Sequence, residues 1–273
     1  MPTIADVAGF FESYTPLRLA EEWDNVGLLV GDPQGPLQRV MTCLTVTPAT
    51  AAEAIRERAE LVVTHHPLPF RPLKRITRET PEGRLLWDLI GARVAVFSPH
   101  TAFDSAAEGI NQRLAEGLEL SQIAPLRPLN EPSGMPTSQP GAAGALGAGR
   151  LGNLKAPATV TQLGQRLKRL LKVENIQSVG EPKRLLRRVA VACGSAGEFL
   201  GIAAEQGCDC LVTGETRFHT CLEAEARGMA LLLVGHYASE RFGVEALADV
   251  LAQQFPGITC WASRDERDPL RWM

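Results

Sequence analysis

The sequence predicts an α/β fold made of two similar halves whose strand ends face one metal-binding cleft. Three observations support this. Apolar, β-branched stretches alternate with helical patterns in both halves of the chain. Residues 39–66 align on residues 188–215 without a gap, and four of the five histidines follow predicted strands. We therefore expect two α/β halves packed about a pseudo-twofold axis.

The composition is that of a globular protein. The chain has 273 residues, 45% of them hydrophobic, and a formal net charge of −3. This length allows one large or two ordinary domains, and the charge gives no electrostatic reason to expect binding to nucleic acid or a membrane. The first residues lack a signal-peptide pattern, and no apolar run approaches the roughly 20 residues that span a bilayer. We therefore expect a cytoplasmic protein.

The cysteines predict a reducing environment. The six of them form no CxxC framework, and several lie in apolar surroundings. Cys208 and Cys210 could bind a soft metal, but buried thiols on a strand are the favoured interpretation.

The first half, residues 1–121, begins with a predicted helix over 3–20, where apolar residues recur at helical spacing and Pro16 ends the pattern. A short apolar run closed by Gly-Asp-Pro follows. The remaining predicted elements are a strand at 39–46, a helix at 49–59, a strand at 60–64, a helix at 82–91, a strand at 92–98 and a helix at 108–118.

Residues 122–149 interrupt this alternation. They are dense in Pro, Gly, Ser and Ala and lack periodicity, which predicts a linker or surface loop. The second half, residues 150–273, resumes the pattern. Its predicted elements are helices at 159–171, 198–207, 219–228 and 239–255, and strands at 187–194, 208–214 and 229–236.

Polar residues at the strand ends agree between the halves. A shared β-α-β rhythm alone would produce part of the alignment, but not this agreement, which favours a true internal duplication. The matching pairs are Arg39 with Arg188, Thr64 with Thr213, His100 with His236 and Asp104 with Glu240.

The residues at these strand ends predict a metal centre. Ligands bind at the carboxyl ends of strands in open α/β sheets. His65, His66, His100 and His236 follow predicted strands, and Asp104, Glu215 and Glu240 lie near them. Imidazole and carboxylate groups together bind zinc, manganese, iron or nickel, and two such ions would polarise a water and hold a substrate oxygen.

Two HxxxD/E units share one spacing, His100 to Asp104 and His236 to Glu240. We expect each unit to form a loop after its strand, with the carboxylate at the position where the next helix begins. Asp104 taken alone would be a helix N-cap, and Glu240 a partner of a helix dipole. Their coincidence at matching places favours a metal centre, although it identifies no reaction.

Several motifs together resemble a known family, the NIF-three-like dinuclear metal proteins, over nearly the whole chain. Many of its bacterial members are named GTP cyclohydrolase 1 type 2 homologues. The motifs are WDNVGLLVG (23–31), VVTHHP (62–67), SPHTAFD (98–104) with the Gly-Ile-Asn that follows, LVTGE (211–215) and GHYASE (235–240).

The resemblance implies two divalent metal ions per chain in an α/β fold and a homohexameric ring with its metal sites inside. It assigns as metal ligands His65, His66, Asp104, His236 and Glu240. It makes Thr64, His100 and Glu215 second-shell or substrate-facing groups.

This chain departs from the family pattern at two places. Thr45 stands where members usually carry an aspartate, which predicts the loss of a hydrogen-bond acceptor near the site. Longer members insert a small domain in mid-chain, where this short form has residues 122–149.

Two further segments have weaker signals. Trp23, Asp24 and Asn25 either shape the cleft or form a packed Trp and a turn. Cys193-Gly194-Ser195 only faintly resembles a nucleophile elbow, and a tight turn is favoured there.

The leading functional hypothesis is a metal-dependent hydrolase of a nucleotide-like or phosphorylated small molecule. The GTP cyclohydrolase activity itself rests on the family resemblance. The rival hypothesis is a metal-binding or regulatory protein that acts as a ring without turnover.

Overall fold

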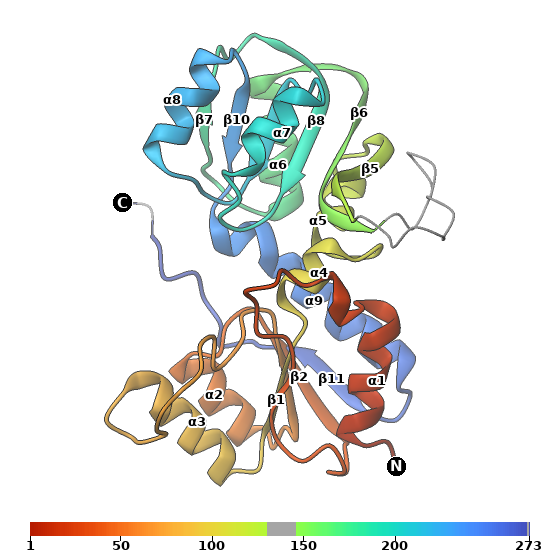
Figure 1. Cartoon of the computed structure of the whole chain (residues 1–273), viewed down its shortest axis with the longest axis vertical. Coiled ribbons are helices and arrows are strands. Elements are labelled where there is room, and N and C mark those ends of the chain that lie inside the picture. The colour runs from red at the N-terminus through yellow and green to blue at the C-terminus, as the bar shows by residue number, and fades with distance from the viewer. Residues whose placement is uncertain (130–145, 272) are drawn as a thin grey trace. The chain divides into compact units, whose positions relative to one another are not determined.

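A computed structural model describes residues 1–129, 146–271 and 273. The chain forms two compact units (Figure 1). Unit 1 comprises Met1–Phe103 and Gly243–Pro269, and unit 2 comprises Asp104–Phe242 and Leu270–Met273. Each unit contains one mixed β-sheet with helices on its faces, which confirms the predicted α/β class.

The sheet of unit 1 has five strands in the order β1-β4-β3-β2-β11. Four of them run parallel, and β1 pairs antiparallel with β4. The last strand of the chain therefore completes the sheet that the first strands begin, as the blue β11 beside β2 shows in Figure 1. The strands are β1 (Gly27–Val30), β2 (Arg39–Cys43), β3 (Leu61–Thr64), β4 (Ala95–Ser98) and β11 (Thr259–Ala262).

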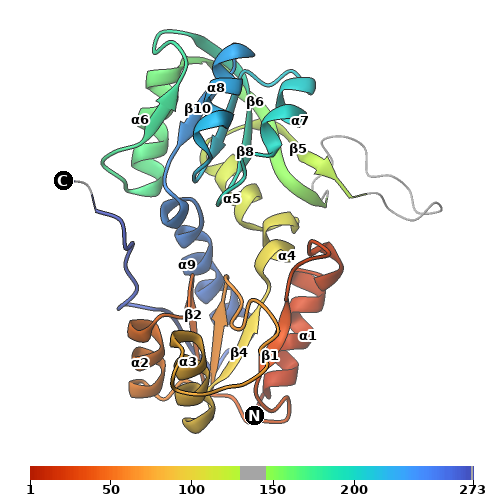
Figure 2. The ribbon, with the colours of Figure 1, turned by 60° about the vertical axis from the view of Figure 1, so that its left-hand side comes forward.

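Helices cover both faces of this sheet. On one face, α2 (Pro48–Arg56) and α3 (Pro81–Gly91) pack on strand residues such as Met41 and Val62. On the other, α1 (Ile4–Tyr14) stacks Phe11 on Phe97 of β4; Figure 2 shows these helices on opposite sides of the strands. The predicted helix over 3–20 ends at Tyr14, and a 3₁₀ turn, η1 (Leu17–Leu19), follows Pro16 because proline cannot continue an α-helix.

The sheet of unit 2 has six strands in the order β5-β6-β8-β9-β10-β7. β8, β9 and β10 are parallel, and the others pair antiparallel. The strands are β5 (Ser121–Pro128), β6 (Gly147–Thr159), β7 (Gln177–Val179), β8 (Leu185–Ala192), β9 (Cys210–Thr213) and β10 (Ala230–Leu233).

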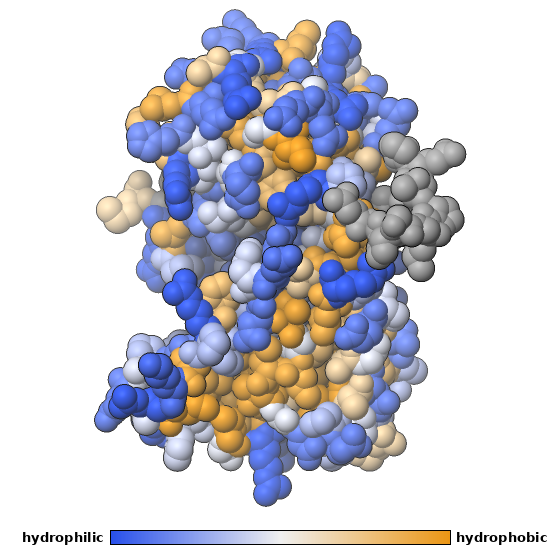
Figure 3. All heavy atoms as spheres, in the orientation of Figure 1, coloured by the Kyte–Doolittle hydropathy of each residue, from blue (hydrophilic) through white to orange (hydrophobic). Residues whose placement is uncertain are grey.

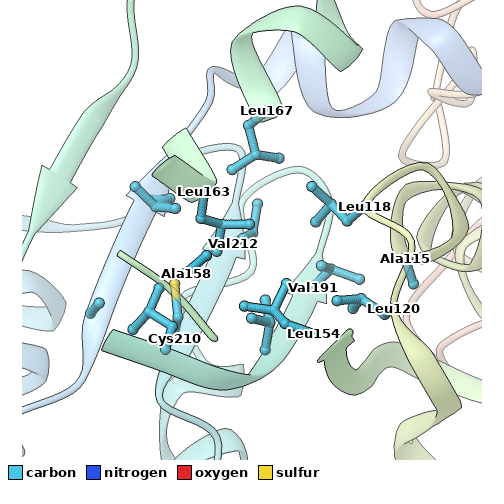
Figure 4. Packing of buried hydrophobic residues seen from close by; sticks show 14 of the residues in the cluster. Ala115, Leu118, Leu120, Leu154, Ala158, Leu163, Leu167, Val191, Cys210 and Val212 are labelled. Carbon is cyan, nitrogen blue, oxygen red and sulfur yellow. The ribbon is translucent and has the colours of Figure 1, made fainter. Parts of the chain in front are cut away.

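Alternate strand residues of unit 2 face two separate cores. One core packs against α5 (Ile110–Gly117) and α6 (Val160–Leu171), and Figure 4 shows Leu118, Leu163 and Leu167 meeting Val191 and Val212 there. The other packs against α7 (Phe199–Glu205) and α8 (Phe218–Ala226). Burial on both faces explains the nearly continuous apolar strands in the sequence.

The two sheets share a central arrangement. In unit 1, β2, β3 and β4 are neighbours and β1 pairs antiparallel with β4; in unit 2, β8, β9 and β10 are neighbours and β7 pairs antiparallel with β10. The register also agrees, since Cys43 lies opposite Thr64 and Ala192 opposite Thr213. The stretches that align in the sequence thus form the same elements.

The structure differs from the sequence expectation in the middle of the chain. The described residues that flank 130–145 belong to the antiparallel strands β5 and β6, so 122–128 and 147–149 are sheet, whereas 130–145 lie outside the described residues. The missed strands are rich in Gly and Pro and gain their hydrogen bonds from partners distant in sequence. The units also divide the chain elsewhere than the predicted halves 1–121 and 150–273, because β11 pairs with β2.

Two helices cross from one unit to the other along the chain. The short α4 (His100–Ser105) leaves unit 1, and α9 (His236–Gln254) returns to it. None of the described helices is long and apolar enough to cross a membrane. In the view of Figure 3, hydrophobic residues gather at the surface of unit 1 around β1, whose residues after Gly27 are half-buried.

Candidate metal centre

The two adjacent histidines lie directly after β3. Their backbone N–H groups donate to Cys43 and Leu44 at the end of β2, at 3.0 and 2.8 Å. Ser98, the last residue of β4, donates its hydroxyl to the carbonyl of His65 at 2.7 Å. The neighbouring strands therefore fix the backbone of the pair. His65 is 1% exposed, and His66 is half-buried.

His100, which follows β4, completes a cluster of three imidazoles in unit 1. Its ring centroid lies 5.1 Å from that of His65 and 5.7 Å from that of His66, and the His65 and His66 centroids are 5.2 Å apart. One nitrogen from each ring lies within 4.8 Å of the other two. Three neutral imidazoles fit a borderline divalent ion such as zinc by donor type.

Thr45 contacts His66 directly. Its Oγ1 lies 2.7 Å from Nδ1 of His66. A hydroxyl group therefore lies beside this imidazole where the family pattern has a carboxylate, and its oxygen can accept a hydrogen bond from a protonated Nδ1. Such a bond fixes the ring and leaves the lone pair on Nε2. Glu266 in turn accepts hydrogen bonds from the backbone N–H groups of Leu44 and Thr45, at 2.9 and 2.7 Å.

Asp24 plays the same part for His100. Its Oδ1 lies 2.7 Å from Nδ1 of the ring, and its Oδ2 accepts bonds from the backbone N–H and the hydroxyl of Thr101. Burial alone would raise the pKa of Asp24, but the bonds from His100 and Thr101 outweigh it and lower the pKa. The carboxylate is thus ionised at neutral pH and accepts a hydrogen bond from the imidazole N–H of His100.

The residues beside Asp24 shape the surroundings of His100. Trp23 is 63% exposed, so it is not the packed tryptophan of the alternative interpretation. Its ring lies edge-on to His100 and to Phe70, at 6.1 and 6.0 Å between centroids. Asn25 donates to the carbonyl of Pro69 at 2.6 Å, which ties the loop after the histidine pair to this segment.

Unit 2 carries its own cluster at the start of α9. Nε2 of His236 lies 3.1 Å from Oε2 of Glu240, and Nδ1 lies 3.0 Å from Oε1 of Glu215. Glu240 is buried, whereas half of the Glu215 side chain is exposed. The hydrogen bond with Glu240 raises the pKa of His236 to about 9; burial opposes this rise and Glu215 adds to it.

The shared HxxxD/E spacing has a different origin from the expected loop. α4 begins at His100 and α9 begins at His236, so each histidine and its carboxylate are four residues apart on a helix. Residues at this spacing lie on the same helical face. The His236–Glu240 contact follows directly from that geometry.

In unit 2, Asp104 is held by Cys193, which directly follows β8, and by Asn111 of α5. The thiol of Cys193 donates to its Oδ1 at 3.1 Å, and Asn111 bridges the Asp104 carbonyl and the Cys193 N–H at 3.1 and 2.8 Å. Burial, then Asp104 and Glu240, raise the pKa of the Cys193 thiol. The thiol of Cys193 thus positions the carboxylate of Asp104 by donating a hydrogen bond to it.

Two glycines bring the backbone close to these ligands. Gly194 has φ +67°, and a Cβ built there would lie 2.3 Å from Oε1 of Glu240. A Cβ on Gly214 would lie 2.6 Å from the carbonyl of Gly194 and 2.9 Å from Cα of His236. The tight turn expected at Cys193-Gly194-Ser195 is thus what lets Glu240 approach.

The remaining predicted residues have supporting positions. Thr64 is fully buried and donates to the carbonyls of Leu44 and His66, at 3.2 and 3.1 Å. Thr213, its counterpart, donates to the carbonyl of Gly194 at 3.2 Å. His219 is exposed on α8. Unit 1 therefore gathers His65, His66 and His100, and unit 2 gathers Glu215, His236 and Glu240.

The comparison with known families decides what kind of protein carries these clusters. The family model described as Duf34/NIF3 (NGG1p interacting factor 3) matches residues 2–269. The chain belongs to this family. Among its Duf34/NIF3 relatives, the GTP cyclohydrolase 1 type 2 homolog of Clostridium perfringens is 32% identical over 271 residues, 98% of each protein.

Two further similarities agree with the Duf34/NIF3 assignment. The protein NIF3 homolog of Schizosaccharomyces pombe is 36% identical over 248 residues, 88% of this chain and 84% of that protein. The crystal structure of the Staphylococcus aureus protein SA1388 superposes with a TM-score of 0.88 at 24% identity, over 100% of this chain and 99% of that one. The latter shows a shared fold.

Sequence reasoning missed several residues that support the clusters of this Duf34/NIF3 chain. Asp24 stood out in the sequence only as part of the stretch WDN, which is typical of a turn. Nothing near it in the sequence indicated that its carboxylate contacts His100. Glu53 and Glu266 carried no signal, although Glu53 is fully buried and accepts bonds from Trp261, Ser263 and the backbone that follows.

Proposed function

We propose that this protein binds two divalent metal ions per chain and uses them to hydrolyse a nucleotide-like or phosphorylated small molecule. The observation that carries the proposal is the gathering of imidazoles and carboxylates at the strand ends of both units, each supported by hydrogen-bonded neighbours. The family resemblance assigns His65, His66, Asp104, His236 and Glu240 to one dinuclear centre. Zinc, manganese, iron and nickel all suit this mixed donor set.

The protein side chains would have distinct roles. Bound metal would supply Lewis-acid polarisation of a water and of a substrate oxygen. Thr45 fixes the ring of His66, Glu215 holds Nδ1 of His236, and Cys193 holds the carboxylate of Asp104. Such partners orient ligands before the metal arrives, which lowers the cost of assembling the site.

The surroundings of His100 support a substrate with a planar ring. Trp23 and Phe70 are 63% and 41% exposed and lie beside His100. Exposed aromatic faces stack on nucleobases with about 1–3 kcal/mol per base. A Trp23→Ala variant should therefore raise KM for a nucleotide while leaving unchanged the KM for glycerol phosphate, a phosphoester without a planar ring. Equal effects on both substrates would remove the nucleotide part of the proposal.

The first experiment is metal content per chain, measured by elemental analysis on protein purified without a metal-affinity tag. Wild type should hold close to two divalent ions, and Asp104→Ala fewer. His219→Ala, which removes an exposed histidine outside the clusters, is the matched control and should hold as many as wild type. Wild type that takes up no zinc, manganese, iron or nickel would refute the proposal.

The activity is tested separately. Metal-loaded wild type is screened against nucleotides and phosphoesters, and its reaction with GTP is followed by formate release and by ultraviolet absorption. GTP that yields neither signal would exclude the cyclohydrolase activity named in relatives. Hydrolysis of another nucleotide or phosphoester would still support the wider proposal.

A second candidate function is a metal-binding or regulatory protein without turnover. The hydroxyl of Thr45, which holds His66 where family members usually carry a carboxylate, favours it because a neutral acceptor polarises the ring less. His66→Ala distinguishes the two. An enzyme loses turnover in this variant, whereas a non-catalytic protein shows metal exchange and no turnover in wild type with any substrate.

We further propose a homohexamer acting in the cytoplasm. The hexamer rests on the family resemblance, and the hydrophobic surface around β1 is a suitable contact (Figure 3). None of the six cysteines, all of which lie in the described part of the chain, forms a disulfide, which fits a reducing compartment. Light scattering coupled to size exclusion should give six times the chain mass of 29.5 kDa.

A further inference from the structure

We propose that His100 is itself a metal ligand, so that His65, His66 and His100 form a three-imidazole site within unit 1. This inference rests on the proposed metal binding but assigns a ligand beyond the five that the resemblance implies. The geometric basis is the mutual distance of at most 4.8 Å between one nitrogen of each ring.

The hydrogen bonds of His100 favour ligation through Nε2. Asp24 lies 2.7 Å from Nδ1, so the Nδ1 proton points to the carboxylate and the lone pair is on Nε2. Metal-bound histidines almost always donate their other N–H to a carboxylate or carbonyl in this way. Asp24 is well fixed, since its side chain is fully buried and it also accepts bonds from Asn25 and Thr101.

The backbone of His100 gives a second, independent argument. Its φ is +25°, a value that a residue with a Cβ rarely adopts. Strained residues of this kind persist where the surrounding structure holds them, and they cluster at functional sites. Here the carboxylate of Asp24 accepts hydrogen bonds from both the ring of His100 and the N–H of Thr101. These bonds hold the strained turn, which places the imidazole beside His65.

The donor set predicts the kind of ion. Three neutral nitrogen ligands favour zinc, cobalt or nickel over manganese and magnesium, which prefer oxygen. Unit 1 should therefore bind a borderline ion without the carboxylates of unit 2. His66 and His100 would each be held at Nδ1 by an oxygen acceptor, Thr45 and Asp24 respectively.

The test uses the full-length chain with the unit 2 ligands His236→Ala and Glu240→Gln removed. Cobalt(II) is added, its stoichiometry and affinity are measured, and X-ray absorption counts the imidazoles around the ion. We expect one ion per chain with three imidazoles. Adding His100→Ala should remove one imidazole from the count, and adding Asp24→Asn should weaken binding by about 10- to 100-fold. Adding His219→Ala should change neither.

The outcomes separate this inference from the proposed function. Wild type that binds no divalent ion would refute both. Wild type that binds two ions, with an unchanged imidazole count in His100→Ala, would overturn only the His100 assignment. Loss of all binding in the His236→Ala, Glu240→Gln background would overturn it as well. Circular dichroism of each variant confirms folding, and Asp24→Asn keeps His100 in place if His100→Ala fails to fold.

Discussion

Oγ1 of Thr45 lies 2.7 Å from Nδ1 of His66, and the N–H of Thr45 donates to Glu266 at 2.7 Å. Glu266, near the C-terminal end, thus fixes the backbone of Thr45. Thr45 in turn contacts His66, a predicted metal ligand. The hydroxyl, rather than a carboxylate, sets the orientation of the ring. Its effect on metal binding can be measured directly.

Thr45→Val should weaken metal binding by about 10-fold, the lower end of the range for second-shell substitutions, because a neutral acceptor is lost. Thr45→Ser keeps the hydroxyl and should bind as wild type. Affinity is measured by competition with a chelator whose metal complex absorbs visible light. Equal affinities of the valine and wild-type proteins would show that Thr45 does not orient His66.

Gly194→Ala should displace the carboxylate of Glu240, because the added Cβ would lie 2.3 Å from Oε1. We expect metal affinity to fall by about 10- to 100-fold and the free energy of unfolding to fall by about 1–2 kcal/mol, since φ is +67°. Gly207→Ala is the matched control: its φ is +72° and its Cβ would have open space. The control should lose the same stability and no metal affinity.

The metal-free protein should show a histidine that titrates near pH 9. Glu240 raises the pKa of His236 to about 9, so the charged pair stabilises the fold below pH 6.5, the usual value, and this contribution is lost as the pH rises through 9. Proton NMR of the imidazole in metal-free protein measures this pKa. Glu240→Gln should return the pKa of His236 toward its usual value. A pKa that stays near 9 in this variant would show that Glu240 does not cause the rise.

The same proton links metal affinity to pH. The imidazole of His236 must lose one ring proton before a metal can bind at the nitrogen that carried this proton. Affinity should therefore rise by about tenfold per pH unit between pH 7 and 9 and then level off. Chelator competition at several pH values measures the slope, and Glu240→Gln should show a smaller one.

Glu53→Gln should lower the free energy of unfolding by about 2–3 kcal/mol at pH 7, because several bonds to a buried carboxylate are weakened. Burial alone would raise the pKa of Glu53, but the bonds from Ser263 and the backbone of Arg264 and Asp265 lower it. Its contribution is therefore complete above the ordinary pKa of 4.5 and is lost as the pH falls through the lowered pKa.

Urea unfolding followed by the fluorescence of the tryptophans, which include the partner Trp261, measures this difference. Wild type and variant should converge in acid. A difference that stayed constant down to the acid transition would show that the effect is one of packing and not of charge.

The residue types of the candidate site could be predicted from the sequence because that information is local. β-branched runs, helical periodicity and the adjacent histidines of VVTHHP are read within short windows, and the repeat showed that both halves end their strands in metal-binding residue types. The α/β class and the family are confirmed on this basis. The HxxxD/E spacing was also correctly noticed, although its helical origin was not.

The tertiary structure decided the contacts that span long stretches of chain. Asp24 meets His100 across 76 positions and Glu53 meets Ser263 across 210, while β11 joins β2 in a sheet formed by the first hundred residues. Such pairings leave no periodic pattern in the sequence, because the residues around each partner reflect only the helix, strand or turn to which that partner belongs. The sequence alone therefore determined which residues can do chemistry and on which strands they end. Only folding determined which acceptor fixes each imidazole, because hydrogen-bond partners depend on distance in space and not along the chain.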